Sequence, residues 1–327
     1  MSGTTLKIPS RREERTPYHG SYLTVGVVCS ISTNFEAVLD VTREIFRPAE
    51  PRATPDIWFQ VWVNTQSQAS PPWPKPYFRG LNHLVFAAYD AANSMLIDLR
   101  RSRALARFSP AMATDAAYWK KVIFPVLLGV IGSSVGITVL HCACVVRENG
   151  GLLLAGASGS GKSTLALALA RNGFDLLSDD WTYVTAREGR VLAWGLPTAL
   201  KLLPDARTYF PELESLQPAV SLNGELAYEI DPEVVFPVRR SFGCVPRCVI
   251  FLEREGQPGL KMTRIPPDVA AGRFQAFLED LPAELSHCRA AQNKVVESLV
   301  ARPCWLLHYS TDPQETARFL SKFYAEL

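Results

Sequence analysis

The sequence lacks a strong excess of charge of either sign. Its 327 residues include 34 Lys and Arg and 32 Asp and Glu, and the formal net charge is +2. A chain so close to neutrality has no global electrostatic attraction to nucleic acid or to an anionic membrane. We therefore expect neither nucleic acid nor a membrane among its partners.

Patterns typical of secretion or of a structural metal site are also missing. The first twenty residues contain no apolar stretch of the kind a signal peptide needs, and residues 1–19 predict a mobile basic tail. The seven cysteines are odd in number and include no C-x-x-C pair. Buried free thiols in a reducing, cytoplasmic setting fit this pattern better than disulfides or metal ligation.

One long uncharged segment raises the question of a membrane span. Residues 122–146 contain no Asp, Glu, Lys or Arg, which is enough chain to cross a bilayer. However, Pro125 and His141 interrupt the apolar run. We therefore expect a buried helix at about 118–132 and a buried strand at about 137–147 instead of a span.

The most informative stretch is GASGSGKST, residues 156–164, which fills the P-loop (Walker A) pattern G-x-x-x-x-G-K-[ST]. An apolar run precedes it, and the helical pattern KSTLALALARNG overlaps its end. This is the strand–loop–helix context that the motif requires. Glycines let backbone N–H groups wrap closely around an anion, and the helix N-terminus adds its dipole. The stretch therefore predicts a nucleotide-binding loop.

Residue types within this loop suit the binding of ATP and Mg²⁺. Lys162 would reach the β- and γ-phosphates, and the Ser163 hydroxyl would ligate Mg²⁺. The residues expected to hold the nucleotide are Gly156, Ser158, Gly159, Ser160, Gly161, Lys162, Ser163 and Thr164.

Two adjacent carboxylates follow at the end of the next apolar strand. In GFDLLSDDWTYV, the strand at 174–177 leads to Asp179 and Asp180. Successive side chains on an extended chain point in opposite directions. One carboxylate can therefore face Mg²⁺ while the other accepts the proton of an attacking hydroxyl. The alternative is a turn between two hairpin strands, a role that Asp commonly fills.

His141 lies in the uncharged strand before the loop strand. It is either a packed core histidine or a side chain that orients an aspartate base and tunes its pKa. The spacing alone favours neither role.

Taken together, three stretches resemble the catalytic domain of the HPr kinase/phosphorylase family: HCACVV at 141–146, the loop with its helix at 156–174, and LLSDDWTYV at 176–184. They are more closely similar to the HPr-kinase-related proteins of bacterial biosynthetic clusters. The resemblance covers about residues 137–186. It implies a P-loop domain similar to phosphoenolpyruvate carboxykinase and transfer of a phosphoryl group to a serine hydroxyl. Family members are often oligomeric, so a homo-oligomer is an expectation as well.

The resemblance also implies roles for individual side chains. Asp179 would be the base that accepts the hydroxyl proton, with His141 oriented on it. Asp180 would support the metal, and Asp205 is the candidate for a further Mg²⁺ carboxylate downstream. The loop residues keep their phosphate and Mg²⁺ roles.

The chain departs from HPr kinases proper at two points. Thr164 stands where those enzymes usually carry Glu. Their basic loop, used for reverse phosphorolysis, has no clear counterpart, and the candidates are Arg239, Arg240 and Arg247. The resemblance therefore implies phosphoryl transfer, and it leaves open whether the chain catalyses phosphorolysis and whether HPr is its substrate.

The pattern along the chain predicts two domains. Residues 20–117 indicate a small α+β unit with an antiparallel sheet, a helix that Asn34 could cap and a Pro/aromatic loop at 69–80. Residues 118–327 alternate buried strands with helices, which predicts an α/β nucleotide-binding domain with a mixed sheet. Its last helix should begin at Asp312 as N-cap.

Two function classes follow. The first is an ATP- and Mg²⁺-dependent kinase acting on a hydroxyl, with a serine of a protein or peptide as acceptor, or a small-molecule alcohol as a variant. The second is a nucleotide-responsive binding or regulatory module without transfer. The pair His141 and Asp179 favours the kinase, because a switch needs no base. Transporter-type ATPases are disfavoured, because the sequence contains no L-S-G-G-Q signature and no apolar strand ending in Asp-Glu.

Overall fold

The computed structural model describes residues 16–50, 53–187, 189–254, 259–278, 288–309 and 312–327. The chain forms two compact units, Met1–Ala116 and Ala117–Leu327. Most of the tail expected at 1–19 lies outside the described residues.

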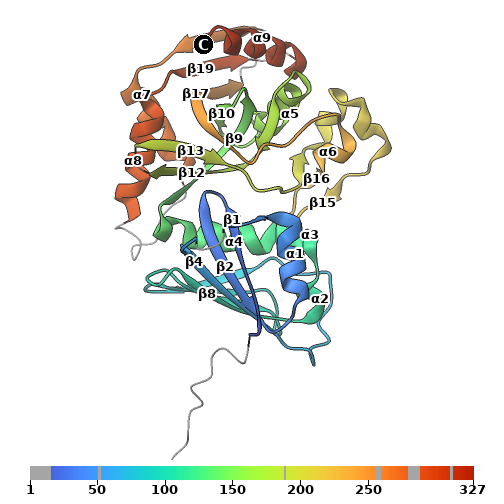
Figure 1. The fold of residues 1–327 in the computed structure, drawn as a ribbon. Helices are drawn as coiled ribbons and strands as arrows, with labels where there is room; N and C mark the ends of the chain where they lie inside the picture. Colours follow the sequence, from blue (N-terminus) through green and yellow to red (C-terminus); the bar gives the residue numbers. More distant parts are fainter. Residues whose placement is uncertain (1–15, 51–52, 188, 255–258, 279–287, 310–311) are drawn as a thin grey trace, which may run out of the picture. The chain divides into compact units, whose positions relative to one another are not determined.

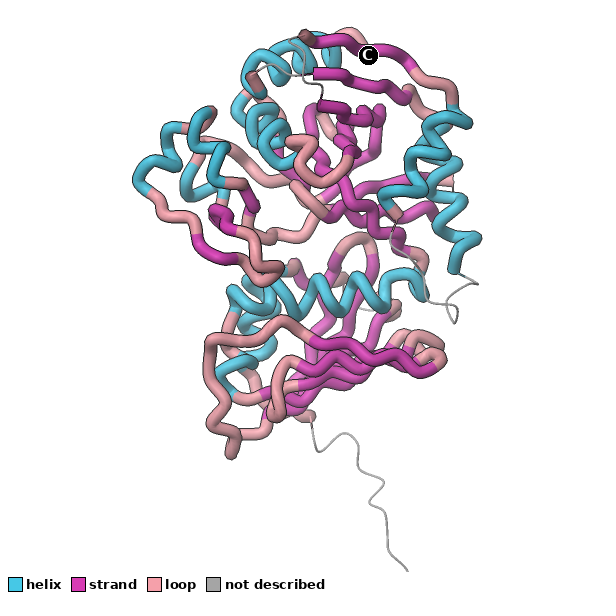
Figure 2. The backbone as a smooth tube through the Cα atoms, turned by 180° about the vertical axis from the view of Figure 1, so that it is seen from behind, coloured by secondary structure: helices cyan, strands magenta, loops and turns pink. Residues whose placement is uncertain are grey.

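The first unit is dominated by one eight-stranded sheet. Figure 2 draws all strands as magenta tube. The strand order is β3-β1-β2-β4-β8-β7-β6-β5. The strands are β1 Tyr18–Thr24, β2 Val27–Thr33, β3 Arg47–Pro48, β4 Ile57–Val63, β5 Tyr77–Leu81, β6 Leu84–Ala88, β7 Ser94–Asp98 and β8 Arg103–Phe108. The helices are α1 Ala37–Ile45 and α2 Pro110–Ala113.

This sheet is mixed, so the expectation of an antiparallel sheet is wrong. β2 pairs with β4 in parallel, and β4 pairs with β8 in parallel, while the other neighbours are antiparallel. Parallel neighbours need a crossover connection. The segment containing α1 connects the first pair, and β5, β6 and β7 lie between the members of the second. Alternation within a strand reveals its buried face but not the direction of its neighbours.

Two local expectations also change. The end of the Pro/aromatic loop, residues 77–80, belongs to β5. Asn34 does not cap α1, since the N-cap position falls at Glu36. The Asn34 amide instead accepts from the backbone N–H of Val63 at 2.7 Å and donates to its carbonyl at 2.9 Å. It therefore ties the start of the helix segment to the end of β4.

The second unit is built around a sheet ordered β10-β9-β12-β13-β17-β19-β18, with β11 paired to β9. β10 also pairs with β17, which closes five of these strands into a ring. The strands are β9 Ile137–Arg147, β10 Gly150–Gly156, β11 Asp175–Ser178, β12 Trp181–Arg187, β13 Arg190–Trp194, β17 Gly243–Arg254, β18 Leu260–Arg264 and β19 Cys304–Tyr309. The pairs β10–β17 and β17–β19 are parallel, and the other pairs are antiparallel. The mixed sheet expected here is confirmed.

The remaining elements complete this unit (Figure 1). The helices are α3 Ala116–Tyr118, η2 Trp119–Ile123, α4 Phe124–Ile131, η3 Gly132–Val135, α5 Lys162–Arg171, α6 Pro232–Val235, α7 Pro267–Phe274, η6 Gln275–Phe277, α8 Arg289–Val300 and α9 Pro313–Ala325. A separate three-stranded sheet consists of β14 Leu200–Leu202, β15 Ala219–Val220 and β16 Leu226–Ile230, accompanied by η4 Pro204–Thr208 and η5 Pro211–Ser215. Asp312 caps α9 by accepting from the backbone N–H of Gln314 at 2.8 Å, as expected.

The uncharged segment forms the end of a helix followed by the buried strand β9, as predicted, but the helix is only partly buried. Residues 116–135 form one helical stretch that is long and apolar enough to cross a membrane, with a mean hydropathy of 1.2. Half of its most apolar stretch is buried inside the protein. The seven cysteines are free and buried, which confirms the expectation from their spacing.

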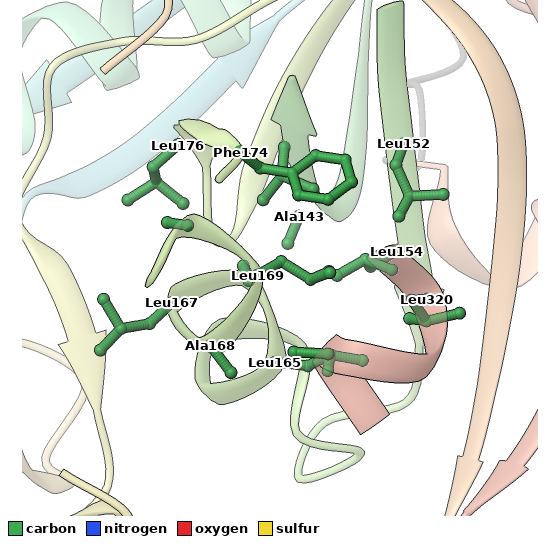
Figure 3. Packing of buried hydrophobic residues seen from close by; sticks show 14 of the residues in the cluster. Ala143, Leu152, Leu154, Leu165, Leu167, Ala168, Leu169, Phe174, Leu176 and Leu320 are labelled. Carbon is green, nitrogen blue, oxygen red and sulfur yellow. The ribbon is translucent and has the colours of Figure 1, made fainter. Parts of the chain in front are cut away.

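The central sheet buries side chains on both faces. Along β10, Leu152 and Leu154 belong to one apolar cluster, whereas Leu153 and Ala155 belong to another. This follows from the two-residue period of a strand. Helices α5 and α9 pack on the first face, and α7 and α8 pack on the second. Figure 3 shows part of the first cluster, to which β10 contributes Leu154 and α9 contributes Leu320. Such a sheet holds the loop after β10 on a rigid base.

Candidate functional site

The glycine-rich loop joins β10 to α5. Gly159 and Gly161 have φ angles of +78° and +87°, which L residues other than glycine adopt only at a cost. A Cβ on Gly161 would lie 2.5 Å from the hydroxyl oxygen of Tyr309. That hydroxyl donates a hydrogen bond to the backbone carbonyl of Ser160. Tyr309 therefore fixes the loop from β19, and glycine is required where the two approach.

Lys162 is folded back inside the loop. Its Nζ donates to the backbone carbonyls of Gly156 at 2.8 Å and Ala157 at 3.2 Å. The side chain is buried, and this burial lowers its pKa from the ordinary value. A cation held at the centre of a glycine-rich turn is well placed to receive a phosphate group.

Asp179 and Asp180 follow β11 and have different environments. Asp179 is only 7% exposed, and its Oδ2 accepts from the backbone N–H of Lys201 at 3.1 Å. Burial raises the pKa of Asp179 to about 6, despite the hydrogen bond from Lys201. Asp180 is more exposed. Partial burial opposes its ionisation, but the hydrogen bond and charge of His141 outweigh this and lower its pKa.

His141 contacts Asp180 and not Asp179, so the pairing implied by the family resemblance is wrong. The imidazole Nε2 lies 2.5 Å from Oδ1 of Asp180. The cause is strand register, because His141 of β9 lies directly opposite Trp181 of β12, the residue after Asp180. His141 is also partly exposed and is not a packed core histidine.

A single cavity of about 280 Å³, here called the polar cavity, gathers most of the predicted residues. It is lined by His141, Ser158, Gly159, Gly161, Lys162, Ser163, Thr164, Asp179, Asp180, Lys201, Leu202, Leu203, Asp205, Asn223, Glu225 and Arg254. Two predicted residues do not line it, Gly156 and Ser160. Both are buried at the base of the loop, where a Cβ on Gly156 would meet Ser160 Oγ at 2.5 Å. Gly156 and Ser160 therefore pack beneath the loop and do not face the cavity.

Four polar residues of the cavity were not predicted from the sequence, namely Lys201, Asn223, Glu225 and Arg254. Lys201 donates from Nζ to Glu225 at 2.5 Å and to Asn223 at 2.9 Å, at the rim formed by the small three-stranded sheet. Arg254 lies at the end of β17, two residues beyond Leu252, which pairs with Gly156. The sequence signal for Arg254 is its position just after the apolar run CVIFL at 248–252.

The arginines proposed as a basic loop lie elsewhere. Arg239 pairs with Asp175 at 3.0 Å, and the guanidinium of Arg247 lies over the ring of Tyr324. Arg240 is nearly buried and donates to the backbone carbonyl of Thr198 at 2.6 Å. These three do not line the polar cavity, so its basic groups are Lys162, Lys201 and Arg254.

The described residues contain no group of three or more His, Cys, Asp or Glu side chains that could hold a metal ion. Mg²⁺ commonly keeps several waters and takes only one or two protein carboxylates together with substrate phosphates. The hydroxyl of Ser163, 3.4 Å from the backbone carbonyl of Asp179, and the carboxylates of Asp180 and Asp205 fit such a shell.

Gly161→Ala should damage the loop more than Gly159→Ala, its matched control. Both changes place a Cβ at positive φ, which costs roughly 1–2 kcal/mol. Only Gly161 has a neighbour in the way, since a Cβ on Gly159 would meet nothing within 4 Å. Urea unfolding should show the larger loss for Gly161→Ala, and adding Tyr309→Phe, which removes the clashing oxygen, should restore part of it. Equal losses in the two single variants would contradict this geometry.

Comparison with known proteins yields little. No protein-family model matches the chain, and no curated protein matches it. The structure of the HPr(Ser) kinase/phosphatase from Coxiella burnetii is similar to 57% of this chain and 97% of its own, at 12% sequence identity and a TM-score of 0.30. A similarity this weak identifies neither family nor activity.

Proposed function

We propose that this protein is an ATP- and Mg²⁺-dependent kinase that transfers the γ-phosphoryl group to a hydroxyl. One observation carries the proposal. A glycine-rich loop around a buried lysine and a buried aspartate with a pKa of about 6 line the same cavity. The loop suits phosphate binding, and the aspartate suits proton transfer near neutral pH.

The residues present fit ATP and Mg²⁺. Lys162 already occupies the loop as a cation bonded to carbonyl oxygens, and a phosphate oxygen can take over those contacts. Lys201 and Arg254 add positive charge around the cavity. When bound, ATP supplies the phosphoryl group and Mg²⁺ neutralises charge on its oxygens. Ser163, Asp180 and Asp205 would hold the metal.

Asp179 would accept the proton of the attacking hydroxyl. A base must be ionised, so transfer should increase as pH rises through about 6 and level off above it. Asp180 is kept ionised by His141 and would face the metal. The acceptor most in keeping with the family resemblance is a serine of a protein or peptide. The proposed kinase domain is residues 118–327, and a cytoplasmic location remains part of the proposal.

Ser163→Ala tests the proposed metal site. The change should raise the Mg²⁺ concentration needed for half-maximal ATP binding, while ATP binding without Mg²⁺ stays the same. Ser158→Ala is the matched control, because the exposed Ser158 would contribute its backbone and not its hydroxyl. Calorimetric titrations at several Mg²⁺ concentrations would measure both. Identical Mg²⁺ dependence in Ser163→Ala and wild type would contradict the role of Ser163.

His141→Gln separates the two aspartates. Because His141 contacts Asp180, its removal should change the Mg²⁺ dependence and let the pKa of Asp180 rise toward its ordinary value. The rise in kcat/KM near pH 6 should persist, since it belongs to Asp179. Profiles of ATP turnover against pH would show this. If the rise in kcat/KM near pH 6 disappeared in His141→Gln, the imidazole of His141 would instead take part in accepting the proton.

A further inference from the structure

A second cavity adjoins the polar cavity at the two aspartates. Its volume is about 250 Å³, and we call it the apolar cavity. It is lined by Lys121, Pro125, Ser178, Asp179, Asp180, Trp181, Tyr183, Leu196, Thr198, Ala199, Lys201 and Glu229. Three of these residues, Asp179, Asp180 and Lys201, also line the polar cavity. The aspartates therefore stand between two spaces of different character.

Carbon surfaces form most of the apolar cavity's wall. Pro125 comes from α4, and Trp181 and Tyr183 come from β12. The Trp181 ring packs against α4, where a Cβ on Gly129 would come within 3.1 Å of it. Leu196 is buried in the segment after β13. Such a wall binds an apolar group by removing its surface from water and offers little to a phosphate or a sugar.

The wall is held in place before any ligand arrives. A Cβ on Gly195 would lie 1.9 Å from the backbone carbonyl of Leu177, so the segment leading to Leu196 presses directly against β11. The nearly buried Arg240 fixes the carbonyl of Thr198 at 2.6 Å. A preformed pocket binds without a large ordering cost.

The charged groups of the cavity are mostly paired. Lys121 Nζ lies 2.5 Å from Glu229 Oε2, and Lys201 bonds Glu225 and Asn223. Ion pairs of this kind leave no strong net charge to attract a charged ligand. Asp179 and Asp180 form the edge that this cavity shares with the polar cavity, so a hydroxyl bound there would lie beside them.

We infer that the apolar cavity is the acceptor site, and that the acceptor is a hydroxyl attached to a compact apolar or aromatic group. The inference rests on the proposed function for its phosphoryl donor. A volume of about 250 Å³ equals that of roughly eight water molecules. A serine side chain alone would leave most of this space empty, and a folded protein could insert only one or two side chains. The acceptor is therefore a small apolar alcohol or a serine next to an apolar residue.

Two probes distinguish these sources: 2-phenylethanol for the small alcohol and N-acetyl-seryl-phenylalaninamide for the peptide. Glycerol serves as the polar control. Saturation-transfer NMR on the full chain should show both apolar probes in contact with the protein and glycerol free. Titration of each probe gives its dissociation constant, and the probe that binds more tightly identifies the source of the acceptor.

Ala199→Trp fills the mouth of the cavity from an exposed position and should weaken binding of both probes by at least about tenfold through steric exclusion. Ala290→Trp on the exposed face of α8 is the matched control and should bind like wild type. Leu196→Ala removes a wall contact and should also weaken binding. Thermal melting checks that each variant is folded.

ATP titrations on the same samples keep the two proposals apart. The wild type could bind a probe, lose that binding on Ala199→Trp and yet bind no ATP. That result would contradict the proposed function, but the apolar cavity would still be a binding site. Failure of the wild type to bind either probe would overturn the inference. So would equal binding by the Ala199→Trp and Ala290→Trp variants.

Discussion

Asp179→Asn should lower phosphoryl transfer by roughly 10²–10⁴-fold, the range for loss of a general base, and leave Mg²⁺-dependent ATP affinity near the wild-type value. Asparagine keeps the shape of the side chain and can still accept from the Lys201 N–H, but it cannot take a proton. ATP turnover and ATP titration on the same preparation would measure the two quantities. A variant that lost ATP affinity and turnover in proportion would show that Asp179 serves binding and is not the base.

The same variant should be more stable than wild type at neutral pH. Burial raises the pKa of Asp179 from 3.8 to about 6, so the ionised carboxylate destabilises the folded state by an amount on the order of 1–3 kcal/mol. Because the folded-state pKa is the higher one, this cost appears as pH rises from about 4 and is complete above about 6. Asparagine carries no such cost. Denaturant unfolding should therefore show the advantage of the variant growing over this pH interval, and an advantage that is constant with pH would contradict the raised pKa.

Lys162→Ala should reduce ATP affinity by roughly 10–100-fold, the value of one or two charge-assisted hydrogen bonds to phosphate. The side chain is buried and bonded to two loop carbonyls, so Lys162→Met, which keeps most of the aliphatic stem, should accompany it. Lys294→Ala on the exposed surface of α8 is the matched control. Nucleotide titration with parallel melting would separate binding from folding. If folded Lys162→Ala and Lys162→Met bound ATP as tightly as the wild type, the loop would not be the site that binds the phosphates of ATP.

Much of the second unit could be predicted because its signals are local. The loop 156–164 needs glycines at positive φ, and an apolar strand and a helix must flank it, all within one short stretch. The adjacent aspartates follow from a strand that ends at Ser178. The strand expected at about 137–147 is β9, and the strand expected at 174–177 lies within one residue of β11.

Other features depend on pairing between distant segments, and the sequence does not encode them locally. The contact of His141 with Asp180 follows from the register of β9 against β12. Arg254 reaches the polar cavity because β17 runs parallel to β10. In the first unit, the parallel pairing of β4 with both its neighbours could not be read from the alternation within β4. Strand register and strand direction depend on tertiary structure, and the residue pattern within a single strand does not specify them.

The proposed function requires transfer of the phosphoryl group to a hydroxyl, as opposed to nucleotide binding alone. The most direct measurement is phosphorus NMR of the full chain incubated with Mg·ATP and either N-acetyl-seryl-phenylalaninamide or 2-phenylethanol, with Asp179→Asn in parallel. We expect a new phosphate monoester that forms in step with ADP in the wild type and is nearly absent with the variant. Inorganic phosphate alone, formed at the same slow rate by both proteins, would contradict it and favour a nucleotide-responsive binding module.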